Sequence, residues 1–292
     1  MLEPAIPGPL SRFANLAIVP SMSNRLDTPT GLNALLGPDD PPPFTVVNSE
    51  AISDVLLVCD HGGIAVPATL NGLGLDQAYL ARHIAQDIGA ADVTRLLAAR
   101  LNAPALFFGY SRLVVDPNRR PDDPTVIREI SDGIVIPGNR SLDAAKRDER
   151  HKLLHRPYHR ALAGMLDRVE ARGVTPAVIS VHSFTPIMKG CERPWHVGIL
   201  TNVDRRMGDA LMAILSETPD ICVGDNEPYS GMSPYGYTIE TQAVPKGFPN
   251  VLLEIRQDLI DTHHGAEEWA GLLGAALQHV LSDRDLFTRF QG

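Results

Sequence analysis

The sequence predicts an α/β protein with three layers, in which a central mixed sheet lies between two layers of helices. Strand-length runs of apolar and β-branched residues alternate along the chain with longer segments of helical apolar spacing. Two of the strand-like runs end in a histidine, at His61 and at His182. Open α/β sheets bind ligands at the carboxyl ends of their strands, so these histidines predict where the functional site lies.

The first elements follow a region rich in proline. Residues 1–44 show little apolar periodicity, and we expect them to form an N-terminal arm, with a single α/β catalytic domain over residues 45–292. The run from Val55 to Cys59 is apolar without alternation, which indicates a buried strand at 55–60. The pattern then predicts a helix over residues 76–100 and strands at residues 104–108 and 112–116.

A long helical stretch is predicted at residues 143–172. Its apolar residues follow steps of four, four, three and four, which place them on one helix face: Leu154, Tyr158, Leu162, Met165 and Val169. Pro157 lacks a backbone donor within this stretch. We therefore expect a kink or two separate helices there.

The second half of the chain continues the alternation. The predicted elements are strands at residues 176–182, 195–200 and 250–256 and helices at residues 204–217 and 264–282. Asp204 is placed to cap the first of these helices. Residues 226–250 are interrupted by proline and glycine, with tyrosines between them, and this segment is predicted to be a long loop that is either functional or mobile.

Composition excludes several classes of function. A formal net charge of -9 without a cluster of Lys and Arg argues against a nucleic-acid partner. The three cysteines have no CxxC spacing, so we expect neither a disulfide framework nor a thiolate metal site, and a reducing cytoplasm is the simplest compartment. Proline interrupts the N-terminal region, and no apolar window is long enough for a membrane span, so neither a signal peptide nor a membrane partner is expected.

The two strand-end histidines suggest a metal site, because neutral imidazoles are good zinc ligands. The glycines after His61 would allow a ligand to approach the backbone closely. The simpler alternative is that each histidine caps its strand. A third ligand is less obvious: His83 and Asp87 lie on one face of the predicted helix, where Asp87 is either a ligand, an orienting group or an ordinary surface residue. Asp60 is expected to point away from His61.

Glu254 interrupts an otherwise apolar strand. An unpaired carboxylate is expensive to bury, so Glu254 is either a general base beside a metal-bound water or the partner of Arg256 in an ion pair. Further polar groups follow the predicted strand at 112–116. Asn118 and Arg119 could hold a substrate carboxylate, or they could belong to a solvated turn.

Three histidines recur every four residues, at His151, His155 and His159, among several arginines. This stripe could line a site for an acid, but such a pattern is more often a solvated basic face, and we leave it outside the predicted site. The sequence holds no GxSxG, P-loop or GxGxxG motif after a strand, which removes the usual support for acyl-serine chemistry, phosphoryl transfer and dinucleotide binding.

Six spaced motifs resemble the N-formylglutamate amidohydrolase family. They begin at Cys59, Arg82, Ser111, Ile136, Val181 and Glu254, and the likeness covers about residues 50–280 in order. The resemblance implies a fold related to the zinc carboxypeptidases and one Zn²⁺ per chain. It also implies hydrolysis of a small anionic N-acyl amino acid, typically N-formyl-L-glutamate to formate and glutamate in histidine breakdown.

The resemblance also implies roles for particular residues. His61 and His182 would be zinc ligands, Glu254 the general base, and Arg119 with Asn118 and Arg112 the anchor of the substrate carboxylate. The zinc carboxypeptidases take a ligand from a glutamate three residues after the first histidine, where this chain has Ile64. We therefore expect Asp87 to complete the site. The alternatives are a zinc deacylase or carboxypeptidase-like enzyme for another N-acyl or peptide substrate, and a non-catalytic protein that binds a metal or small acid.

Overall fold

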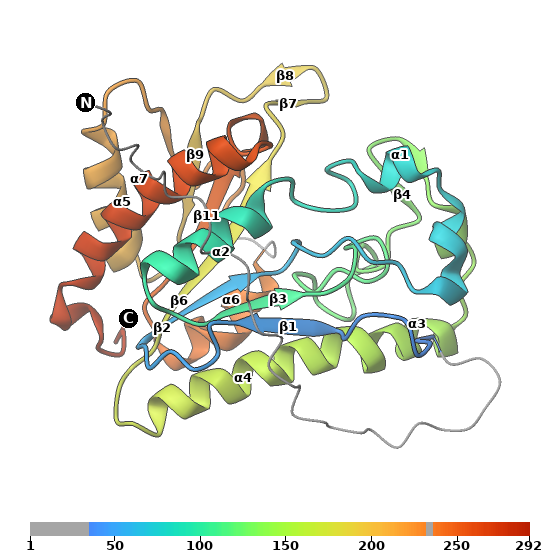
Figure 1. The fold of residues 1–292 in the computed structure, drawn as a ribbon, viewed down its shortest axis with the longest axis horizontal. Coiled ribbons are helices and arrows are strands. Elements are labelled where there is room, and N and C mark those ends of the chain that lie inside the picture. Colours follow the sequence, from blue (N-terminus) through green and yellow to red (C-terminus); the bar gives the residue numbers. More distant parts are fainter. Residues whose placement is uncertain (1–34, 232–235) are drawn as a thin grey trace, which may run out of the picture. The chain divides into compact units, whose positions relative to one another are not determined.

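A computed structural model of the protein describes residues 35–231 and 236–292. Seven strands form one sheet in the order β1-β3-β2-β6-β11-β9-β10 (Figure 1). They are β1 (Phe44–Val47), β2 (Val55–Cys59), β3 (Ala105–Phe108), β6 (Ala177–Phe184), β9 (Val197–Leu200), β10 (Val223–Asp225) and β11 (Asn250–Arg256). The central strands β3, β2, β6 and β11 are parallel, whereas β1 and the β9-β10 pair run antiparallel to them. The predicted mixed sheet is confirmed.

Helices cover both faces of this sheet (Figure 1). One layer consists of α2 (Ala90–Arg100), α5 (Arg206–Ser216) and α7 (His263–Leu281), and the other of α4 (Arg156–Glu170) and α6 (Tyr237–Gln242). The connections hold α1 (Gln77–Leu80), α3 (Ala144–Arg150) and two hairpins, β4 (Ile130–Ser131) with β5 (Ile134–Val135) and β7 (Ile187–Met188) with β8 (Cys191–Glu192). The three-layer prediction is therefore also confirmed.

Strand alternation divides the apolar residues between two cores. In β2, Leu57 and Cys59 pack against the layer of α2, α5 and α7, whereas Leu56 and Val58 pack against the layer of α4. Burying one leucine side chain contributes about 1.5–3 kcal/mol. A slip of one residue in register would expose or misplace both sets, so the two cores fix the register of the central strands.

The predicted helix over residues 76–100 is wrong. Only α1 and α2 are helical, and residues 81–89 between them form an irregular connection. The break ends at Gly89, whose backbone has a φ of 77°, outside the helical region. A β-carbon on Gly89 would lie 2.1 Å from the carbonyl oxygen of Ile260, so tertiary packing requires glycine here.

Other differences also lie in the irregular segments. The strand predicted at 112–116 is a turn, and the supposed loop at 226–250 contains α6, with residues 232–235 outside the described part. The long helical stretch at 143–172 forms α3, a π-helical turn at His151–His155 and α4 without interruption. Pro157 lies in the first turn of α4, where the π turn accommodates its missing donor.

The remaining predicted elements are confirmed, with ends that differ by no more than one or two residues. Strands β1 and β10 were not predicted. Most of the predicted N-terminal arm lies outside the described residues; within its last part, Leu35 is buried and Phe44 begins β1. Among the described residues, no helix is long and apolar enough to cross a membrane.

Candidate metal centre

The polar residues of interest gather at the carboxyl ends of three neighbouring parallel strands. His61 follows β2, while His182 on β6 and Glu254 on β11 are partners in the strand register. Alternation turns both side chains toward the face covered by α4 and α6, because their apolar neighbours Val181 and Leu253 pack against the opposite layer. The sheet therefore brings two imidazoles and a carboxylate together at the edge where α/β proteins bind ligands.

Asp87 joins the two histidines at this edge. One of its oxygens, Oδ2, lies 2.8 Å from Nδ1 of His182 and 3.2 Å from Nδ1 of His61. Ligand atoms from the three residues lie within 4.8 Å of one another, and all three side chains are buried. Two imidazole nitrogens and one carboxylate oxygen that converge in this way form a donor set suited to zinc.

The connection between α1 and α2 positions Asp87. Its backbone N–H donates to the carbonyl oxygen of His61 at 3.0 Å, and the Ser183 hydroxyl donates to the carbonyl oxygen of Ile88 at 2.8 Å. These bonds tie the connection to the ends of β2 and β6. Asp87 therefore does not share a helix face with His83, whose ring lies 3.7 Å from Asp132 instead.

The glycines after His61 have a packing role. A β-carbon on Gly63 would come within 2.4–2.5 Å of backbone atoms of residues 108–110, and one on Gly62 within 2.8 Å of the Cys59 sulfur. Real β-carbons do not approach other atoms so closely. The space beside Gly63 is thus filled by the chain itself, and the expectation that a ligand would use it is wrong.

Each histidine is also held from its other side. Nε2 of His61 lies 2.7 Å from Oδ1 of Asp116. Nε2 of His182 lies 3.0 Å from the Ser180 hydroxyl and 3.3 Å from Oδ2 of Asp60. Buried acids that hold one ring nitrogen leave the other nitrogen for a metal and fix the orientation of the ring. Asp60, the sequence neighbour of His61, thus contacts the ring of the other histidine, His182.

Asp60 is fully buried but well satisfied. Its Oδ1 accepts hydrogen bonds from the Tyr158 hydroxyl at 2.8 Å and from the Thr238 hydroxyl at 2.7 Å. Burial opposes the charge on Asp60, but the bonds from His182 and Thr238 outweigh it and lower its pKa. The carboxylate that orients His182 is therefore ionised.

Arginine residues balance the buried acids. Arg112 donates to Oδ1 of Asp87 at 3.2 Å and to Oδ2 of Asp116 at 2.9 Å, while Arg119 and Arg128 approach Asp116 to 4.0 and 3.9 Å. Burial opposes the charge on Asp116, but Arg112 and His61 hold its pKa well below the usual range. Arg112, Arg119 and Arg128 therefore meet around one carboxylate.

The environment of Glu254 excludes the proposed ion pair with Arg256, which bonds to Asp258 at 2.8 Å. Only 7% of Glu254 is exposed, and its Oε2 has no hydrogen-bond partner among the described residues. Burial raises the pKa of Glu254 to about 7. The charge of His182 lowers this pKa, and the charge of Asp87 raises it. Such a carboxyl group readily exchanges a proton.

This chain is similar to known proteins in sequence and in structure. The family model of N-formylglutamate amidohydrolase matches residues 53–261. The chain belongs to this family. The crystal structure of gene product Atu2144 from Agrobacterium tumefaciens is similar, with 34% sequence identity, a TM-score of 0.83 and coverage of 86% of this chain and 99% of that one. No curated protein matches.

A second solved structure has the same fold as this amidohydrolase. It is the N-formylglutamate amidohydrolase from Ralstonia eutropha JMP134, with 20% identity and a TM-score of 0.64. The match covers 84% of this chain and 99% of that one.

The segment after Asp116 brings two predicted substrate binders to this amidohydrolase site. Oδ1 of Asn118 accepts the backbone N–H of Thr238 at 3.0 Å, which joins the segment to α6. Arg119 lies beside Asp116 and also approaches Asp123, at 3.8 Å. Arg112 is bonded to Asp87 and Asp116, but these bonds do not use all of its N–H donors.

Several residues near the site escaped the sequence analysis. Arg193 donates to the Tyr229 hydroxyl at 3.1 Å and lies 5.0 Å from the centre of its ring. Burial raises the pKa of Tyr229, the charges of Glu254 and Asp87 raise it further, and Arg193 lowers it. Only the tyrosine-rich composition of residues 226–250 signalled such a role. Nothing local identified Tyr158 or Asp116 as parts of the site.

The histidine stripe was also misinterpreted. His151, His155 and His159 are buried rather than solvated, with exposed fractions of 7%, 2% and 8%. His155 and His159 are turned toward the segment that holds Asn118, whereas His151 packs against the ring of His155.

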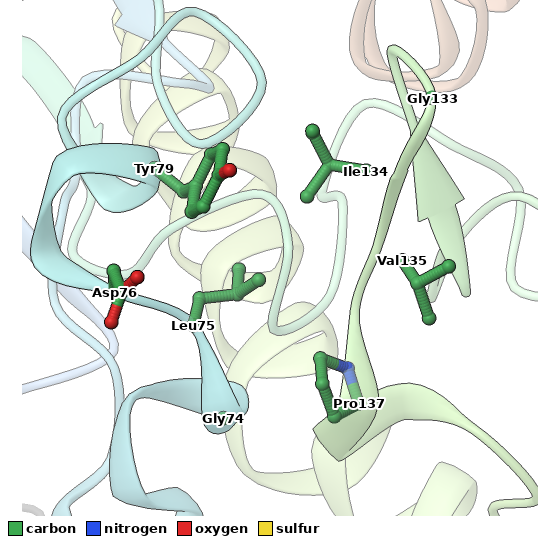
Figure 2. Close-up of a pocket in the computed structure, with 8 residues that line it drawn as sticks. All are labelled: Gly74, Leu75, Asp76, Tyr79, Gly133, Ile134, Val135 and Pro137. Atoms are coloured by element: carbon green, nitrogen blue, oxygen red, sulfur yellow. The ribbon is translucent and has the colours of Figure 1, made fainter.

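A cavity of about 340 Å³ lies between α1 and the β4-β5 hairpin, apart from the candidate metal centre (Figure 2). Its lining is formed by Gly74, Leu75, Asp76, Tyr79, Gly133, Ile134, Val135 and Pro137. None of the residues gathered around Asp87 lines it. The cavity is therefore separate from the candidate site.

Proposed function

We propose that this amidohydrolase cleaves N-acyl amino acids with one zinc ion per chain, held by His61, Asp87 and His182. The first substrate we propose is N-formyl-L-glutamate, which would yield formate and L-glutamate. The convergence of two Nδ1 atoms on one oxygen of Asp87 supports this proposal most strongly. Three protein ligands that leave a fourth position open are typical of catalytic zinc.

The surroundings of these ligands fit a zinc ion. Both Nε2 atoms are held by Asp116 or Asp60, so the Nδ1 atoms are the ones free to bind a metal. When bound, zinc would polarise the amide carbonyl and make water more acidic. Glu254, whose Oε2 points to no protein partner among the described residues, would take the proton from that water and return it to the leaving amine.

Arginine residues would recognise the amino-acid part of the substrate. We assign Arg119 and Asn118 to its carboxylate, with Arg112 contributing a further N–H donor. A guanidinium group binds a carboxylate through two parallel hydrogen bonds, which fixes orientation as well as charge. The residues 226–231 and α6 would close the site over the substrate, since Thr238 is already bonded to Asn118.

The experiment that tests this function combines elemental analysis of the purified protein with an amine-release assay. N-formyl-, N-acetyl- and N-succinyl-L-glutamate serve as substrates. We expect one zinc per chain and the highest kcat/KM for the formyl compound. Faster hydrolysis of another acyl group would favour a related deacylase, and bound zinc without turnover would favour a binding protein. Full activity of a metal-free His182→Ala variant would contradict the mechanism.

We also propose a cytoplasmic location and a role in histidine breakdown. Three unpaired cysteines support a reducing compartment. Formation of L-glutamate from its N-formyl derivative would be the chemical link to histidine breakdown. Detection of labelled N-formyl-L-glutamate turnover in cells that express the protein, and its loss in cells without it, would test that role.

A further inference from the structure

The α4 helix and the π turn before it present one face to the residues that surround the candidate metal centre. His155 and His159 lie four residues apart, hence on the same face, and each makes one hydrogen bond to the segment of residues 116–119. Nε2 of His155 lies 3.0 Å from the carbonyl oxygen of Arg119, and Nε2 of His159 lies 2.8 Å from that of Pro117. Neither carbonyl belongs to a helix or strand.

The chemistry of these contacts fixes the direction of each bond. A carbonyl oxygen only accepts, so Nε2 of both histidines must carry a proton and donate it. The Nδ1 atom of His159 is buried and has no hydrogen-bond partner among the described residues. Since only one of its nitrogens is satisfied, His159 is oriented by its bond to Pro117.

The carbonyl groups of Pro117 and Arg119 are the immediate chain neighbours of two residues of the candidate site. Asp116, which precedes Pro117, is bonded to the ring of His61, and Asn118, which lies between the two, is bonded to Thr238. Asp116 also accepts the backbone N–H of Asn118 at 3.0 Å, so the segment forms one bonded unit. Displacing the carbonyl of Pro117 would therefore move the carboxylate that orients His61.

The same helix face supports the other histidine. Tyr158, next to His159 on α4, donates to Asp60, which holds His182. The ring of Tyr237 packs beside both histidines of this face, with ring centres 5.5 Å from His155 and 5.1 Å from His159. Residues 155–159 thus contact both the segment that holds Asp116, the partner of His61, and Asp60, the partner of His182.

We infer that His155 and His159 are positioning residues of the metal centre, which act by donating hydrogen bonds to the backbone of residues 116–119. The inference rests on the proposed metal centre for its effect on zinc, but not for its effect on the segment itself. The π turn at His151–His155 contributes by setting the phase at which the helix presents these donors.

The test compares variants with and without the donor. His159→Gln keeps an amide N–H near the position of Nε2, whereas His159→Met fills a similar volume without a donor. The same pair is made at His155. His151→Met is the matched control, because His151 is buried in the same stripe and contacts the ring of His155 rather than the 116–119 segment.

Two quantities are measured for each folded variant. The first is the zinc dissociation constant, from competition with a chelator. The second is the hydrogen-exchange protection of the Asn118 and Thr238 backbone amides in metal-free protein. For His159→Met we expect zinc to bind roughly 10-fold more weakly, at the low end of what is lost when a partner of a metal ligand is removed. Protection of both amides should fall as well.

His159→Gln should restore both quantities to within about 3-fold of the wild type, and His151→Met should change neither. Equal effects of His159→Met and His151→Met, or no rescue by glutamine, would overturn the inference. If His159→Met fails to fold, the pair at His155 decides. Wild-type protein that binds no zinc would refute the proposed function, and amide protection would still test the role of the histidines.

Discussion

Glu254 lies opposite His182 in the register of two parallel strands, and both side chains reach the same face at the carboxyl edge of the sheet. The pairing of β11 with β6 extends over seven residues, from Asn250 and Val178 to Arg256 and Phe184. A proposed general base and a proposed metal ligand are thus held by two continuously paired strands of the central sheet. Catalytic geometry of this kind tolerates little displacement.

Asp87→Asn should abolish zinc retention. The amide keeps the size of the side chain but is a poor zinc ligand, and we expect affinity to fall by more than about 100-fold, beyond the usual loss for an indirect partner. Elemental analysis after dialysis measures the effect. Asp132→Asn is the control, since this acid pairs with Arg82 at the surface. An Asp87→Asn protein that still holds one zinc would assign the third ligand elsewhere.

Glu254→Gln should separate metal binding from catalysis. The glutamine is similar in size but cannot take a proton, so kcat should fall by about 10²–10⁴. Zinc content should remain at the wild-type value, because Glu254 is not one of the three proposed ligands, His61, Asp87 and His182. Single-turnover amine release is the measurement. Unchanged kcat in this variant would exclude Glu254 as the base.

Arg119→Gln should raise KM for N-acyl amino acids. Loss of a charged hydrogen bond of about 1.5–3 kcal/mol corresponds to roughly a 10- to 150-fold change. The effect should disappear when the carboxylate of the substrate is replaced by a carboxamide. Arg120→Gln is the neighbouring control, because Arg120 is exposed and pairs with Asp122. Equal KM values for Arg119→Gln and Arg120→Gln would remove Arg119 from the binding site.

Tyr158→Phe should destabilise the protein and weaken zinc binding together. The change removes one of two hydroxyl donors to the buried Asp60 oxygen, at a cost of about 1–3 kcal/mol in the free energy of unfolding. Urea denaturation of metal-free protein measures this cost. Tyr79→Phe, at the separate cavity, should change stability by less than about 0.5 kcal/mol. A stable Tyr158→Phe protein with unaltered zinc affinity would show that Asp60 needs only Thr238.

Stability should fall in mild acid because of His159. Burial, with a contribution from the nearby His155, lowers the pKa of His159 to about 4 in the folded protein, against about 6.5 in an unfolded chain. As pH falls from about 6.5 to about 4, the unfolded chain binds a proton that the folded protein does not. This group alone would cost about 3 kcal/mol over that window.

His159→Gln removes this titration. Urea unfolding at several pH values between 4 and 7 should therefore show a smaller loss of stability with acid in the variant than in the wild type. His151, whose pKa burial also lowers to about 4, keeps its own contribution in both proteins. Identical pH dependence of the two proteins would show that His159 is not buried in its neutral form.

The strands of the central sheet could be predicted because their pattern is local. The unbroken apolar run of β2 indicates a strand that is buried on both faces. The single acid within the apolar run of β11 marks a polar position in a buried strand. The meeting of the candidate site residues at one edge of the sheet could be predicted for the same reason. His61, His182 and Glu254 follow or interrupt apolar runs, and parallel strands bring such positions to one edge.

The environment of these residues could not be predicted, because the contacts that create it span large sequence separations. Tyr158 and Asp60 are 98 positions apart, and Thr238 and Asp60 are 178 apart. The histidine stripe shows the same limit. Its spacing fits a solvated helix face as well as a buried one, and only the packing of α4 against the sheet and the 116–119 segment distinguishes the two.

By itself the sequence determined the α/β architecture and the positions of two histidines and one acid at strand ends. The pattern of apolar and polar residues that predicts strands and helices involves only residues close together in the chain. Tertiary structure decided how Asp87 joins them. Asp87 lies in an irregular connection whose path depends on Gly89 against Ile260 and on a backbone bond to His61. Such a path has no periodic pattern, because distant partners rather than neighbouring residues satisfy its hydrogen bonds.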